Sequence, residues 1–104
     1  MVTTRRKPPA RKRAAESPAG GRPVRVLRVQ TGVRMERRMV KVLKALAELK
    51  DLSLGDLLEG IVLHAFDGKV PFTSETLRQI GELKRVYGLD LDSSASHRMI
   101  ETEP

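Results

Sequence analysis

The chain has 104 residues, with 20 lysines and arginines, 13 acidic residues, no cysteine and a formal net charge of +7. This length allows one small domain, and the lack of cysteine removes disulfides and cysteine-based zinc sites as stabilising elements. We therefore expect oligomerisation to compensate for the small core. No stretch approaches the roughly 20 apolar residues of a membrane-spanning helix, and no apolar segment follows the N-terminal arginines as in a signal peptide. We expect a cytoplasmic protein without a membrane partner.

Charge is distributed unevenly along the sequence. Residues 1–21 carry six Lys or Arg against one acidic residue, residues 22–50 carry nine against two, and residues 51–104 carry five against ten. These blocks contribute net charges of +5, +7 and −5. A basic front half followed by an acidic rear half favours a polyanionic partner that the front half binds.

Residues 1–23 consist mainly of Arg, Lys, Pro, Ala and Gly, with almost nothing to bury. We interpret them as a disordered basic arm. Such an arm can contact phosphates non-specifically and raise affinity in a salt-dependent way. A solvated tail with no such role is the alternative.

Residues 24–35, with the sequence VRVLRVQTGVRM, alternate in a way that predicts a half-buried strand. Its more apolar face is formed by Val29, Thr31, Val33 and Met35. Its opposite face is formed by Arg28, Gln30, Gly32 and Arg34. No second stretch repeats this alternation, so the strand must find its backbone partner outside its own chain. The same strand of a second copy is the simplest partner.

Two helices are predicted to follow. Residues 36–50 carry apolar side chains at helical spacing, without a clear N-cap. Ser53 is a favourable N-cap for a second helix that continues to a stop near Gly68, and Asp56 supplies the carboxylate of a capping box. This second helix is apolar nearly all round and contains no Lys or Arg, so we expect it to be buried against a partner subunit.

The C-terminal extension, residues 69–104, contains a third predicted helix. It runs from Ser74 to about Tyr87, with Thr73 as N-cap and Gly88 ending it. Beyond Leu91 the sequence predicts a frayed tail.

A basic strand followed by a helix, a short turn and a buried helix resembles the ribbon-helix-helix superfamily of DNA-binding proteins. The resemblance covers about residues 28–67, within a predicted domain of residues 24–68. It implies a mostly α fold with one N-terminal strand, in which a homodimer forms an intermolecular two-stranded antiparallel ribbon, here with an extra C-terminal helix. It also implies that this ribbon enters the major groove of double-stranded DNA.

The resemblance assigns roles to three groups of residues. Base contacts fall to the outward strand face, Arg28, Gln30, Gly32 and Arg34, of which Gln can bind adenine and Arg guanine with two hydrogen bonds. Phosphate contacts fall to the N-terminus of the second helix and the start of the first, namely Ser53, Leu54, Gly55, Arg37 and Arg38. The dimer core comprises Val29, Val33, Met35, Leu46, Leu57, Leu58 and Ile61.

These assignments lead us to expect a transcriptional regulator, a repressor or autoregulator associated with the nucleoid. A helix-turn-helix protein is disfavoured because the second helix, which would enter the groove, carries Asp56 and Glu59 and no basic residue. We expect no enzyme activity, cofactor or metal site, since no nucleophile elbow, phosphate loop or metal triad is present. Two alternatives stay open: an antitoxin or adaptor whose C-terminal half binds a protein, and a non-specific basic DNA-coating protein.

Overall fold

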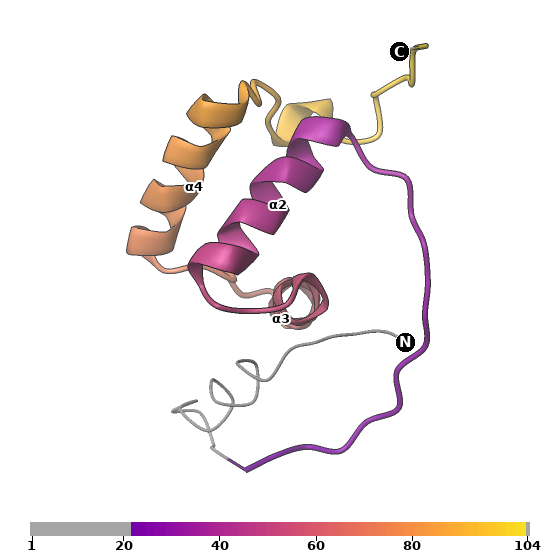
Figure 1. Cartoon of the computed structure of the whole chain (residues 1–104), viewed down its shortest axis with the longest axis vertical. Coiled ribbons are helices and arrows are strands. Elements are labelled where there is room, and N and C mark those ends of the chain that lie inside the picture. The colour runs from indigo at the N-terminus through magenta and orange to yellow at the C-terminus, as the bar shows by residue number, and fades with distance from the viewer. Residues whose placement is uncertain (1–21, 104) are drawn as a thin grey trace.

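The computed structural model describes residues 22–103, which form three α-helices and one short 3-10 helix. In chain order these are α2 (Arg37–Leu49), α3 (Leu54–Phe66), α4 (Ser74–Tyr87) and η1 (Ser93–Ala95). Helices α2 and α4 lie side by side, and α3 is seen end-on beneath them (Figure 1). The prediction of a mostly α fold is confirmed for these residues. The predicted basic arm lies outside them, except for its last two positions.

The N-terminus of each α-helix is closed by a side chain of the preceding residue. The hydroxyl of Ser53 accepts a hydrogen bond from the backbone N–H of Asp56 at 3.1 Å, and Thr73 caps α4 in the same way. Both caps confirm the sequence prediction. Helix α2 also has a cap, because the Glu36 carboxylate accepts from the Met39 N–H at 3.0 Å. The sequence analysis missed it because Glu is not among the preferred N-cap residues.

Each α-helix also ends in the same way, on a residue in the left-handed region. These residues are Asp51, Gly68 and Gly88, with φ of 64°, 70° and 68°. The residue after each one donates its N–H back to a carbonyl in the last helical turn, as when Leu89 binds Lys84 at 2.8 Å. Such paired terminal bonds satisfy carbonyls that the helix itself leaves free.

The core is centred on α2, which packs against both α3 and α4. Leu46 is only 1% exposed and forms a cluster with Ala47 and Leu57. Six half-buried apolar residues surround this cluster: Leu43, Leu52, Ile61, Phe72, Ile80 and Leu83. Ile80 and Leu83 come from α4, so the C-terminal extension shares the core of the preceding two helices.

Helix α3, which we expect to be buried against a partner subunit, is largely open in the single chain. Among its residues only Leu57 is buried, whereas Val62, Leu63 and Phe66 are exposed, Phe66 by 81%. The reason is geometric, because α2 covers one side of α3 and α4 packs on α2 instead. Burial of the open side by a partner subunit stays a prediction.

Residues 22–36 contain no helix and no strand, and run in a wide arc beside the helices (Figure 1). Their backbone groups from residue 24 to 35 make no hydrogen bond with the backbone of another described residue. Val29 is 87% exposed and Val33 is 74% exposed. The predicted strand is therefore not formed by the single chain, and the intermolecular ribbon stays a prediction.

The segment after α4 differs in part from the frayed tail predicted beyond Leu91, because Ser93–Ala95 form η1 whereas residues 99–103 have no regular structure. The Asp92 carboxylate accepts hydrogen bonds from the N–H and the hydroxyl of Ser94, at 2.9 and 2.5 Å, and these bonds begin η1. Both bonds hold the pKa of Asp92 below its usual value, and the bond from the Ser94 hydroxyl has the larger effect. Local side-chain capping thus orders the start of η1, where Ser93 and Ser94 offer no apolar side chain to bury.

Candidate nucleic-acid interface

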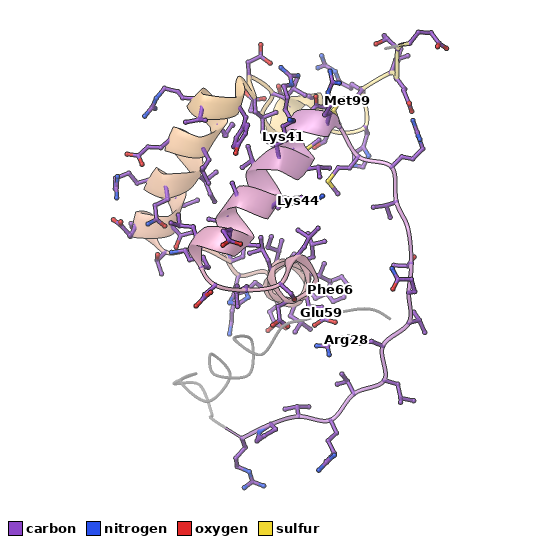
Figure 2. The ribbon with its side chains drawn as sticks, in the orientation of Figure 1. Arg28, Lys41, Lys44, Glu59, Phe66 and Met99 are labelled. Carbon is purple, nitrogen blue, oxygen red and sulfur yellow. The ribbon has the colours of Figure 1, made fainter. Side chains whose placement is uncertain are left out.

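The first basic side chain of the arc that meets the helices is Arg28. Its Nε and Nη2 donate to the two carboxylate oxygens of Glu59, both at 2.7 Å, and its Nη2 lies 3.8 Å from the carboxylate of Asp56. Figure 2 shows Arg28 and Glu59 pointing toward one another from the arc and from α3. This two-point geometry is the one that arginine uses for carboxylates and phosphates alike.

This ion pair shifts the pKa of both partners. The hydrogen bonds from Arg28 hold the pKa of Glu59 below its usual value, although partial burial opposes the shift. The hydrogen bond to Glu59 likewise raises the pKa of Arg28. Because both side chains are largely exposed, solvent screens the pair and its contribution to folding is small.

Arg34 also binds a carboxylate, but in a different part of the molecule. Its Nε donates to Glu101 at 3.2 Å and its Nη2 donates to the second oxygen of the same carboxylate. Glu101 follows Arg34 by 67 positions, so this contact brings the C-terminal tail against the arc. Both side chains are exposed.

Arg38 links the start of α2 to the end of α4. Its Nη1 donates to the carbonyl of Gly88 at 2.9 Å and to the carboxylate of Asp90 at 3.0 Å. Its Nε donates to the Glu36 carboxylate at 2.9 Å. Burial acts to raise the pKa of Glu36, but the hydrogen bonds from Arg38 and Met39 outweigh it and the pKa is lowered. Arg38, which we expect to contact a DNA phosphate, thus also joins the start of α2 to the end of α4.

The remaining members of the predicted base-contacting face are open to an outside partner. Gln30 and Gly32 are exposed; the Gln30 side chain makes no hydrogen bond with a described residue, and a Cβ added to Gly32 would meet no atom within 4 Å. On α2, Arg37 is exposed, and Lys41 and Lys44 follow it at helical spacing. Figure 2 shows Lys41 and Lys44 along this helix. Within the part of the chain that is described, these three cations have no ion pair.

The start of α3, expected to bind phosphate, is accessible. Ser53, which caps it, and Gly55 are exposed, and a Cβ added to Gly55 would approach only the Ser53 hydroxyl, at 4.0 Å. Leu54 is half-buried between them. The Asp56 carboxylate does not fold back over the helix end but lies near Arg28. The structure therefore brings Arg28 to the first turns of α3, and it places Arg34 elsewhere, beside the tail.

The carboxylates that meet these arginines were not identified by the sequence analysis. Asp56, Glu59, Asp90 and Glu101 all belong to the acidic rear half, and each pairs with an arginine of the basic front half. The only sequence feature that points to them is the reversal of charge between the two halves. Which carboxylate meets which arginine depends on the fold.

Two further features limit the chemistry of this region. Between residues 22 and 103, no three His, Cys, Asp or Glu side chains come together as they would to hold a metal ion. None of the described helices combines the length and apolar character needed to cross a membrane.

Comparison with known proteins gives no assignment. No protein-family model matches this chain, and no significant match was found among curated proteins or solved structures.

Proposed function

We propose that this chain is a homodimeric, sequence-specific DNA-binding regulator of the ribbon-helix-helix type. The observation that carries the proposal is the arc of residues 24–35, whose backbone is unpaired within the described chain and which presents Arg28 and Arg34 on one face of an alternating sequence. Exposed peptide groups in a row form a template for a second strand. A second copy provides the same sequence and completes a two-stranded ribbon with exact twofold symmetry.

Dimerisation also accounts for the apolar surface that the single chain leaves open. Val29 and Val33 on the arc, and Val62, Leu63 and Phe66 on α3, are all exposed. Large apolar side chains left exposed in such number on a small protein are typical of an interaction site. In the proposed dimer these side chains fill the space between the ribbon and the helices of both copies, together with Leu58 and Ile61, which are half-buried.

The opposite face of the ribbon then presents Arg28, Gln30 and Arg34 to the major groove. Gln can make two hydrogen bonds to adenine and Arg two to guanine, which distinguishes one base pair from another. Arg37 and the accessible start of α3 are placed to contact the flanking phosphates. Residues 22–50, with their net charge of +7, supply the electrostatic attraction.

Selection of bound fragments from a random DNA pool at two salt concentrations tests the proposal. We expect a defined motif with twofold symmetry. Arg34→Ala should remove about 1–3 kcal/mol of preference for the motif, while Arg37→Ala should weaken selected and random DNA equally. No enrichment, or equal losses on both DNAs for Arg34→Ala, would instead indicate a non-specific basic DNA-coating protein.

The antitoxin or adaptor alternative requires the C-terminal half to await a protein partner. Exposed Val86 and Ile100 offer apolar surface for one. However, α4 already packs on α2 and contributes Ile80 and Leu83 to the core. This packing favours a plain regulator.

A further inference from the structure

The acidic C-terminal tail lies against one of the arginines on which the proposed DNA contact depends. Both N–H groups on one edge of the Arg34 guanidinium, at Nε and Nη2, donate to Glu101. A phosphate or a guanine requires the same kind of two-point contact. That edge of the side chain cannot bind Glu101 and DNA together.

The path of the tail toward Arg34 is fixed by contacts of its own. Arg38 holds Gly88 and Asp90 at the start of α2. The Asp92 carboxylate then closes η1, which lies beside the same end of α2 (Figure 1). The chain that leaves η1 thus starts from a fixed point close to the end of the arc that carries Arg34.

From these contacts we infer that the tail is an intramolecular competitor of DNA, in which Glu101 occupies Arg34 as a substitute for a nucleic-acid oxygen. This inference rests on the proposed function and adds a regulation to it. Any DNA that binds through Arg34 must first displace Glu101. The tail therefore lowers the affinity for DNA, and its largest effect is on the contact made by Arg34. The competition is electrostatic and weakens as salt rises.

The chain offers a matched control for this inference. Glu103 is also exposed in the tail, two residues further on, and makes no ion pair with a described residue. Glu101→Gln and Glu103→Gln remove the same charge and preserve side-chain shape. Only the first removes the contact with Arg34.

The experiment measures DNA affinity of the full chain at low salt for the two variants, with circular dichroism to verify helicity. Glu101→Gln should bind about two- to fivefold more tightly than wild type, as expected for loss of an exposed ion pair. Glu103→Gln should shift affinity clearly less. In an Arg34→Ala background the two changes should become equal, because the contact is already absent.

Each other outcome has a distinct meaning. Equal shifts for the two variants in the wild-type background would overturn the inference while leaving DNA binding intact. A difference that persists after Arg34→Ala would overturn it also, since Glu101 would then act through another group. Failure of both wild type and Glu101→Gln to bind any DNA would overturn the proposed function, and the inference with it.

Discussion

The helices and the arc that precedes them obey different constraints. The three α-helices have their ends capped by their own side chains and meet around Leu46, which is almost completely buried. The arc of residues 22–36 has no such internal support, and Val33, whose type ordinarily lies inside proteins, is 74% exposed. Contacts within one chain are therefore sufficient to fix the helices, whereas the conformation of the arc depends on what it contacts.

The largest expected effect tests the helical part. Leu46→Ala removes a side chain that is 1% exposed and leaves a cavity between α2 and its neighbours. It should lower the free energy of unfolding by about 2–5 kcal/mol, measured by urea denaturation. Leu49→Ala, on the same helix but 53% exposed, is the control and should cost less than about 1 kcal/mol. Equal losses would show that the core is not centred on Leu46.

The second prediction tests the arc. Val33→Asp should leave helicity unchanged, because the side chain touches no core, but should raise the dimer dissociation constant by about 10- to 100-fold through the loss of apolar burial. Sedimentation equilibrium measures this change. Val70→Asp, similarly exposed but in the loop before α4, should have no such effect. A wild-type chain that stays monomeric and folded at micromolar concentration would contradict the proposed dimer.

The third prediction compares two glycines in and after α4. Gly88 has a φ of 68°, so Gly88→Ala should destabilise the chain by about 1–2 kcal/mol. Gly81 lies inside the helix, and a Cβ there meets no atom within 4 Å, so Gly81→Ala should stabilise by up to about 1 kcal/mol. Thermal denaturation should give shifts of opposite sign. A stabilising Gly88→Ala would rule out the left-handed helix end.

The smallest effect concerns the contact that joins the arc to α3. Because the folded-state pKa of Glu59 is below its usual value of 4.5, its stabilising effect is present above that value and is lost as pH falls through the lowered pKa. The pair is largely exposed, so we expect only a few tenths of a kcal/mol. Carboxylate titration by NMR should show the Glu59 pKa rising toward its usual value in Arg28→Ala. An unchanged titration would mean that Arg28 does not bind Glu59.

Sequence alone was sufficient for features that depend on neighbouring residues. Ser53 and Thr73 were identified as caps, and Gly88 as a helix end, because these residue types have specific preferences there. The helices between them follow from apolar spacing. The Glu36 cap was missed because Glu is not a preferred N-cap residue, and η1 was missed because Asp-Ser-Ser is common in irregular chain as well.

The candidate interface was predictable only in part. Alternation identified Arg28, Gln30 and Arg34 as members of one face, but it could not show that Glu59 and Glu101 bind two of them. Those contacts join residues 31 and 67 positions apart, and they depend on how α3 and the tail are placed by the core. The charge distribution indicated that the front half is basic and the rear half acidic, but not which residues would pair.

The unsupported backbone of the arc has a consequence for turnover of the protein. A peptide chain that is accessible and not hydrogen-bonded within its fold fits readily into a protease active site. The exposed Arg25, Arg28 and Arg34 are cleavage points for trypsin-like enzymes. Cleavage there separates the preceding residues from the helices, whereas pairing of the arc in the proposed ribbon would protect it. If the proposed dimer forms, we expect unassembled copies to be degraded first, which would link the lifetime of the chain to its concentration.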